Sequence, residues 1–368
     1  MINQARLINR FMELVQIDSL SREERAMADR LKPELLALGA VVREDQSGKK
    51  IAGNAGNLIA DFSDQIDGPL LLLSAHMDRV EPGRGIKAEI RGDYLVSQGE
   101  TVLAGDDLIA VAAILEALTG LQEKGERYGR IKVIFTVAEE QGLLGAKSID
   151  PEEIKSADYG IVFDLDDQVG MIVDKAPSQF KFNATIIGKS PSAGVDAIKI
   201  ASKAISEMKL GRPDRGITAN IGVIKGGKAS HLTADFVELE GETRGHSTEH
   251  LKKQVGHIKE VISKATAKYQ GQASFRIEKN YPGFEIARDS DIIKLVEKSI
   301  QRLDLPLTYR ASSGGSDANI FNQYGLPTVN LGIGAERVHS PEERVKIDNM
   351  IKLAQLISKI IEINRGND

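Results

Sequence analysis

Leu70-Leu71-Leu72-Leu73-Ser74-Ala75-His76-Met77-Asp78 is the stretch of sequence that decides the fold. Four consecutive apolar residues before a polar cluster are typical of a fully buried strand that ends at the edge of a sheet. Side chains two positions apart on an extended backbone point to the same side, so we expect His76 and Asp78 to share one face. A histidine beside a carboxylate at a rigid strand end supplies the donors of a metal site. The segment alone does not distinguish a metal ligand from a hydrogen-bonded polar histidine.

Later segments place carboxylates or a histidine where a predicted strand ends or a helix begins. Their position matters because open α/β sheets build their sites at the carboxyl ends of their strands. The segments are Asp106-Asp107 before the apolar stretch 108–118, Glu139-Glu140 after the strand 131–137, Asp164 and Asp166 after the strand 159–163, and His339 after the strand-like run 325–332.

Each of these segments has an ordinary structural interpretation. Asp106 and Asp107 suit the first turn of a helix, because aspartate caps free N–H groups and its charge complements the helix dipole. Glu139 and Glu140 suit a solvated turn, and His339 suits the surface. Together, the clusters of histidine and carboxylate favour a hydrolase with two metal ions that share a bridging carboxylate.

Composition limits the class of protein. With 368 residues, the chain is longer than one ordinary core, so we expect two domains. A net charge of −5 and the lack of dense Lys/Arg runs argue against a nucleic-acid partner. There is no cysteine for a disulfide or a thiolate site. The first 15 residues lack the apolar core of a signal peptide and no apolar stretch is long enough to span a bilayer, so we expect a cytoplasmic enzyme without membrane contact.

Hydrophobic periodicity divides the chain in two. Strands alternate with helices over residues 1–177 and resume over 285–368, which predicts an α/β sheet domain with helices on both faces. Residues 178–284 follow the order strand, helix, two strands, helix, strand, which predicts a smaller inserted α+β unit. Ser21 and Glu24 have the spacing of a capping box and predict the start of the second helix.

The order and spacing of these motifs resemble the M20 family of metallopeptidases, most closely its peptidase T-like branch. The resemblance covers nearly the whole chain. It rests on His76-Met77-Asp78, Gly105-Asp106-Asp107, Ala138-Glu139-Glu140-Gln141-Gly142, Phe163-Asp164, Gly314-Gly315-Ser316-Asp317 and His339.

The resemblance implies a catalytic domain that holds two divalent ions, usually zinc. It implies that His76, Asp164 and Asp106 hold one ion. The other would be held by Glu140, His339 and the same Asp106, which bridges the pair. The donor set has nitrogen and oxygen but no sulfur, so it suits zinc, cobalt and manganese about equally well. Asp166 remains an alternative to Asp164, because a register shift of the strand would exchange them.

The same resemblance assigns catalytic roles to two further carboxylates. Glu139 would be the general base that takes a proton from a water bridging the two ions, and Asp78 would support the site. Glu139 cannot readily ligate tightly and act as base, which leaves ligation to its neighbour Glu140.

The inserted unit resembles the lid domain of the family, which implies a possible homodimer through residues 178–284. Ser192 occupies the position of the usual lid histidine, and His231 occupies that of a usual asparagine. Either Ser192 donates to the developing oxyanion, or His231 has taken over that role. Arg244 matches the lid arginine that would bind a substrate carboxylate. Gly314 would contact substrate through its backbone, or the glycine pair 314–315 forms only a tight turn before a short helix.

The sequence therefore predicts a dinuclear-metal peptidase that acts on short peptides in the manner of a tripeptide aminopeptidase. Another amidohydrolase of the same family, a deacylase or a dipeptidase, is the alternative with the same metal residues. A metal-retaining homologue that binds peptides with weak catalysis is a third possibility, motivated by Ser192. Such a binder would not need Glu139.

Overall fold

The chain forms two compact units in the computed structural model, which describes residues 2–62, 66–127, 129–188, 194–214 and 216–365. The first unit contains the chain up to Asp174, then Glu285–Ala311, and then the residues from Ser316 onward. The second unit contains Lys175–Phe284 together with the short segment Ser312–Gly315.

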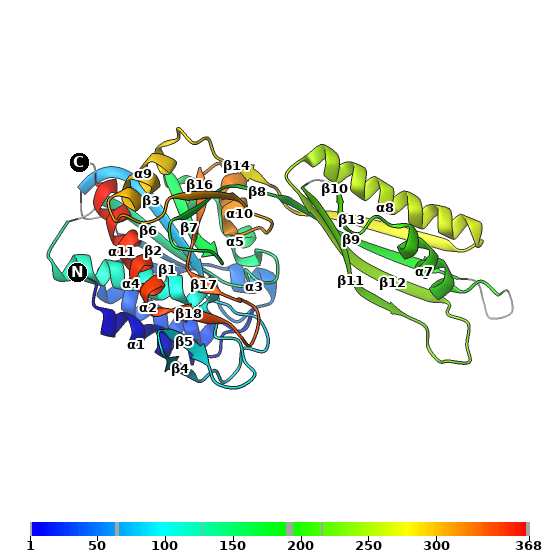
Figure 1. Cartoon of the computed structure of the whole chain (residues 1–368), viewed down its shortest axis with the longest axis horizontal. Coiled ribbons are helices and arrows are strands. Elements are labelled where there is room, and N and C mark those ends of the chain that lie inside the picture. Colours follow the sequence, from blue (N-terminus) through cyan, green and yellow to red (C-terminus); the bar gives the residue numbers. More distant parts are fainter. Residues whose placement is uncertain (1, 63–65, 128, 189–193, 215, 366–368) are drawn as a thin grey trace. The chain divides into compact units, whose positions relative to one another are not determined.

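The first unit is built on a mixed sheet of nine described strands in the order β1-β2-β6-β3-β7-β16-β8-β14, with β15 paired to β8 (Figure 1). The four central strands β6, β3, β7 and β16 run parallel to one another, and β1, β2 and β8 run antiparallel to their neighbours. The strands are β1 Val41–Glu44, β2 Leu58–Phe62, β3 Ile66–His76, β6 Gly129–Thr136, β7 Tyr159–Leu165, β8 Met171–Ala176, β14 Phe284–Glu285, β15 Thr308–Ala311 and β16 Thr328–Gly332.

A smaller antiparallel sheet lies beside the large one in the same unit, with the order β17-β18-β5-β4. Its strands are β4 Ala88–Arg91, β5 Tyr94–Ser97, β17 Ala335–Glu336 and β18 Arg344–Lys346. The helices of this unit are α1 Gln4–Val15, α2 Arg25–Ala37, α3 Ser47–Ile51, α4 Gly105–Glu123, α5 Leu144–Ser148, α6 Pro151–Lys155, α9 Asp291–Gln301, α10 Asp317–Gln323 and α11 Ile347–Asn364.

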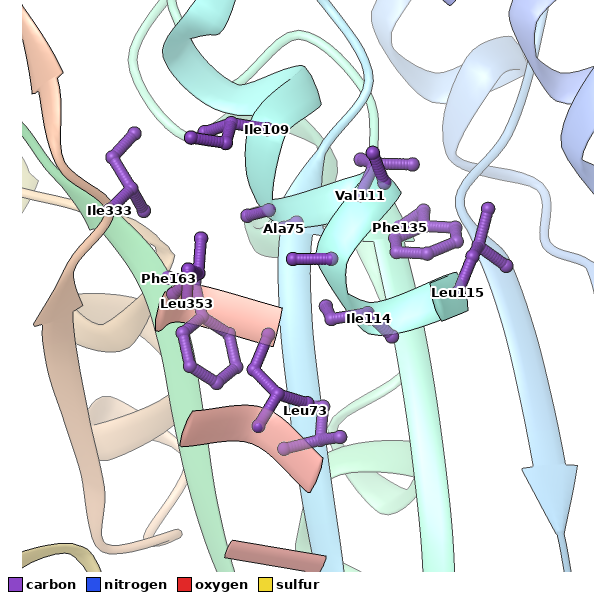
Figure 2. Packing of buried hydrophobic residues seen from close by; sticks show 14 of the residues in the cluster. Leu73, Ala75, Ile109, Val111, Ile114, Leu115, Phe135, Phe163, Ile333 and Leu353 are labelled. Carbon is purple, nitrogen blue, oxygen red and sulfur yellow. The ribbon is translucent and has the colours of Figure 1, made fainter. Parts of the chain in front are cut away.

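The main hydrophobic core lies between the large sheet and helices α4 and α11. Figure 2 shows Ile109, Val111, Ile114 and Leu115 of α4 packed over side chains of the central strands, among them Leu73. Helix α4 is apolar around almost its whole circumference, which is typical of a helix buried on all sides. Helix α10 packs on β7 and β16 outside this core, so helices cover both faces, as the sequence predicts.

The second unit is a five-stranded antiparallel sheet in the order β10-β11-β12-β9-β13, and helices α7 and α8 pack on one face of it. Alternate residues of β9, such as Phe182 and Ala184, are buried beneath these helices. The elements are β9 Ser178–Ile187, α7 Ala197–Glu207, β10 Gly211–Asp214, β11 Ile217–Gly226, β12 Phe236–Gly245, α8 Thr248–Lys268 and β13 Gln272–Tyr281. The predicted α/β class with a smaller α+β insertion is therefore confirmed.

One local prediction is wrong. Helix α2 begins at Arg25 and has Glu24 as its N-cap without a side-chain cap, so Ser21 and Glu24 form no capping box. Both side chains are engaged elsewhere, Ser21 with Asp78 and Glu24 with the backbone of Arg22 and Ala138. Within the described ranges, no helix has the length and apolar character needed to cross a membrane.

Candidate metal centre

The carboxyl ends of the parallel strands deliver the candidate residues to one edge of the large sheet. His76 is the last residue of β3, and Glu139 and Glu140 follow β6. Asp164 lies near the end of β7, and His339 lies in the hairpin between β17 and β18 that follows β16. Asp106 comes from the start of α4. The peptide bond between Asp106 and Asp107 is cis.

Asp106 lies between two histidines that are far apart in the sequence. Its Oδ1 is 3.3 Å from Nε2 of His76, and its Oδ2 is 3.2 Å from Nε2 of His339. Nε2 of His339 is also 2.7 Å from Oε1 of Glu140, and Nε2 of His76 is 4.0 Å from Oδ1 of Asp164. A single carboxylate therefore presents one oxygen to each half of the cluster.

The orientation of His76 is fixed by its other ring nitrogen. Nδ1 lies 3.0 Å from the backbone oxygen of Asp78, which can only accept, so Nδ1–H is the donor. Nε2 then faces Asp106, donating to its carboxylate while it carries a proton and free to ligate a metal once that proton is lost. Burial lowers the pKa of His76, but the hydrogen bonds to Asp106 and Asp78 outweigh this effect and raise the pKa well above 6.5.

His339 differs from His76 in exposure and backbone conformation. Its backbone has a φ of 61°, in the left-handed region, and its side chain is 47% exposed. Hydrogen bonds to Asp106 and Glu140 raise the pKa of His339 to about 11. The proximity of these two carboxylates therefore favours a positive charge at this position.

The described part of the chain holds two groups of candidate ligand atoms, each within 4.8 Å of one another: His76, Asp106 and Glu140, and His76, Glu139 and Asp164. Burial raises the pKa of Glu139 and of Asp164 well above the ordinary values. Buried carboxylates are costly unless they are neutralised, and divalent cations provide that neutralisation. Nitrogen and oxygen donors without sulfur fit zinc, cobalt or manganese.

Asp164 is the carboxylate of its segment that faces the cluster, whereas Asp166 is exposed. The side chain of Asn330 holds the backbone of Asp164 in place. Asn330 Oδ1 accepts the Asp164 N–H at 2.9 Å, and Asn330 Nδ2 donates to the Asp164 carbonyl oxygen at 2.9 Å.

Asp78 is fully buried and connects three segments of the site. Its Oδ1 accepts the backbone N–H of Glu139 at 2.9 Å, and its Oδ2 accepts that of Glu140 at 3.2 Å. The hydroxyl of Ser21 also donates to Oδ2, at 2.6 Å. Burial opposes the charge of Asp78, but the bonds from His76 and Ser21 outweigh it and lower the pKa.

Two further buried glutamates hold backbone segments of the centre. Glu24 Oε1 accepts the N–H of Ala138, just before Glu139, at 2.9 Å, whereas Glu24 Oε2 has no hydrogen-bond partner among the described residues. Glu343 Oε2 accepts the N–H groups of Leu103 and Ala104, and its Oε1 accepts that of Asp106 at 3.0 Å. Burial raises the pKa of Glu24 and of Glu343 to about 7.

The residues predicted to bind substrate lie in the second unit. Arg244 is near the end of β12, and its Nε donates to Glu242 at 2.8 Å. A Cβ built on Gly314 would lie 3.7 Å from Nη1 of Arg244, so these two predicted residues are neighbours. His231 is exposed in the turn between β11 and β12. Ser192 lies outside the described residues.

Comparison with known proteins agrees with this arrangement. The model of peptidase family M20/M25/M40 matches residues 72–363, from β3 to α11. The chain belongs to this family.

Solved relatives of this M20 chain include a tripeptidase from Staphylococcus aureus, with 40% identity, coverage of 99% of both chains and a TM-score of 0.94. The aminopeptidase PepT from Bacillus cereus has 39% identity, 99% coverage of both chains and a TM-score of 0.88. The uncharacterized protein YqjE of Bacillus subtilis is 38% identical over 98% of this chain and 99% of its own length.

Sequence reasoning missed the roles of four residues that hold the candidate centre by binding its backbone or, in the case of Ser21, the side chain of Asp78. They are Ser21, Glu24, Asn330 and Glu343. The sequence pattern singles out only Ser21 and Glu24, and it predicts a helix cap for both. Asn330 lies inside the strand-like run 325–332, but an asparagine in an apolar run carries no direct signal of what it binds.

Proposed function

We propose that this M20 chain is a dinuclear-metal-dependent peptidase that hydrolyses short peptides, as a tripeptide aminopeptidase does. The observation that carries the proposal is Asp106, with one carboxylate oxygen 3.3 Å from His76 and the other 3.2 Å from His339. Two of its relatives, a tripeptidase and an aminopeptidase, support the choice of short peptides.

His76, Asp164 and Asp106 would hold one ion, and Glu140, His339 and Asp106 would hold the other. Zinc is the ion we favour, and cobalt and manganese suit the same donors. When bound, the pair of ions would polarise the scissile carbonyl and lower the pKa of a water.

Glu139 would take the proton of the attacking water and pass it to the leaving amine. Its side chain is buried and belongs to the group with His76 and Asp164, so it lies beside two of the proposed ligands. Asp78 would act as a positioning residue, because it accepts from the backbone N–H of Glu139 and orients His76.

Substrate selection would involve the second unit. Arg244 would bind the substrate carboxylate through its planar guanidinium, with the backbone of the neighbouring Gly314 beside it. His231, or Ser192, would donate to the developing oxyanion. We further expect a cytoplasmic enzyme and a homodimer formed through residues 178–284.

A panel of peptides tests the proposal. Protein stripped with a chelator is reloaded with zinc, cobalt or manganese and given dipeptides, tripeptides and N-acetylated tripeptides. We expect metal-dependent release of the N-terminal residue from free tripeptides and no release from the acetylated ones. Preferential cleavage of acetylated substrates would indicate a deacylase, and preferential cleavage of dipeptides a dipeptidase. Metal uptake without cleavage would indicate a peptide-binding homologue.

A further inference from the structure

Glu343 connects the two segments that carry Asp106 and His339. Its carboxylate accepts three backbone N–H groups of the loop before α4: Leu103 at 2.8 Å, Ala104 at 2.9 Å and Asp106 at 3.0 Å. The side chain is 2% exposed, so these bonds are shielded from water. Charge-assisted hydrogen bonds of this kind are stronger than bonds between neutral groups.

The same residue is rigidly joined to His339. The backbone N–H of Glu343 donates to the carbonyl oxygen of Ser340 at 3.0 Å, which closes a turn that begins one residue after His339. Beyond Glu343, β18 pairs with β17 and β5. The position of His339 is therefore fixed from both sides of the hairpin.

Gly105 allows the loop and the hairpin to come this close. A Cβ on Gly105 would lie 2.7 Å from Cγ2 of Val345 and 3.1 Å from Oε1 of Glu343. Any larger residue would push the Asp106 segment away from the hairpin. The three hydrogen bonds to the buried Glu343 carboxylate thus define how far the loop of Asp106 lies from the hairpin of His339.

We propose that Glu343 is a positioning residue that holds Asp106 and His339 at the separation needed to share an ion with Glu140. This inference rests on the proposed function. The three hydrogen bonds that the Glu343 carboxylate accepts all come from backbone N–H groups, so it acts on the position of Asp106 through the loop. Asp106 would serve both ions, but His339 would serve only one, so the loss of Glu343 should weaken mainly the ion on the His339 side. The other ion would keep His76 and Asp164, which are held by Asp78 and Asn330.

The test compares E343Q with E342Q, a matched control at the exposed neighbouring position. Glutamine at position 343 keeps the shape but turns an NH2 group toward at least one backbone donor. Metal-free protein is titrated with Co²⁺ and followed by calorimetry and by the visible absorption of bound cobalt. We expect wild type and E342Q each to bind two ions, with affinities that do not differ between the two proteins. E343Q should bind its second ion about 10–100-fold more weakly than they do.

Two further measurements distinguish positioning from a general structural role. Excess Co²⁺ should restore the kcat of E343Q on a tripeptide, because the weakened site is refilled. In metal-free protein, the amides of Leu103, Ala104 and Asp106 should exchange with deuterium faster in E343Q and not in E342Q. G105A leaves Glu343 intact and should show the same selective weakening of the second ion.

Binding of both ions by E343Q with wild-type affinity would overturn the inference. Parallel loss of both ions together with a lowered unfolding temperature would also overturn it, since that pattern belongs to a damaged fold. Wild-type protein that takes up fewer than two ions would instead overturn the proposed function, whatever the variants do.

Discussion

Asn330 brackets the backbone of Asp164, accepting its N–H and donating to its carbonyl oxygen, both at 2.9 Å. The pairing of β7 with β16 shifts register at this point, with Leu331 opposite Phe163 and Gly332 opposite Leu165. Asp164 is thus skipped by the neighbouring strand, and the amide side chain takes the place of the missing backbone partner. The hydrogen bonds from Asn330 thus hold the Asp164 backbone in the position from which its carboxylate faces the candidate centre.

Replacement of Asn330 by alanine should destabilise the protein and weaken metal binding together. N330A leaves a donor and an acceptor of Asp164 unpaired, which should cost about 2–4 kcal/mol in the free energy of unfolding. Urea unfolding and zinc titration measure the two effects. N322A is the control, because Asn322 makes similar bonds to Ala318 and Thr328 away from the centre. Equal metal affinity in N330A and N322A would contradict the prediction.

Loss of the Ser21 hydroxyl should reduce turnover with little effect on the fold. S21A removes one of the donors to Asp78 but leaves the N–H groups of Glu139 and Glu140 in place. We expect kcat on a tripeptide to fall by about tenfold. S19A, in the same loop, removes a bond to Arg79 instead and should leave kcat near that of the wild type. The hypothesis fails if both variants lose turnover to the same extent.

Glu139 and Glu140 should have separable roles although they are adjacent. E139Q removes the proposed base, so kcat should fall by about 100- to 10,000-fold while both ions stay bound. E140Q removes a proposed ligand, so the ion near His339 should be lost first. Metal analysis after dialysis, combined with steady-state kinetics, separates the two. Metal loss from E139Q greater than from E140Q would show that the roles are reversed.

Glu24 should make the stability of the metal-free protein depend on pH. Burial and the charge of Asp78 raise the pKa of Glu24 to about 7 from its ordinary 4.5. The folded protein therefore holds this proton more tightly than the unfolded chain, and the contribution of Glu24 to stability falls as the pH rises from 4.5 through 7.

E24Q should remove this dependence, because glutamine resembles the protonated acid and still accepts from Ala138. Relative to wild type, E24Q should gain free energy of unfolding on the order of 3 kcal/mol between pH 4.5 and pH 8. Urea unfolding in the presence of a chelator at several pH values measures the difference. Curves for the two proteins that stay parallel over this range would rule out a raised pKa at Glu24.

The fold and the residues of the candidate centre differ in how far sequence predicts them. Strands such as β3 are continuous apolar runs, so their ends, and the polar residues after them, can be located from the pattern. Asp106 and His339 are brought together as the strand-end argument expects. Glu343 could not be found in this way, because its partners are backbone N–H groups 237 to 240 positions away and every residue but proline carries one.

The failed capping box has the same cause. Serine followed three residues later by glutamate satisfies a local rule, but both side chains bind partners from distant segments instead. Short-range rules therefore work for α4 and α8, where the partners are local or apolar, and fail where polar groups from distant segments compete.

The strand order of the large sheet bears on how the protein is made. Strands β7 and β8 are consecutive in the chain, but β16 lies between them. During synthesis, the edges of β7 and β8 that pair with β16 have no such partner until the second unit has been translated and β16 emerges. A chain interrupted before Thr328 would lack both this strand and His339, so an incomplete nascent protein cannot assemble the centre. The candidate centre can thus form only after His339 has been synthesised.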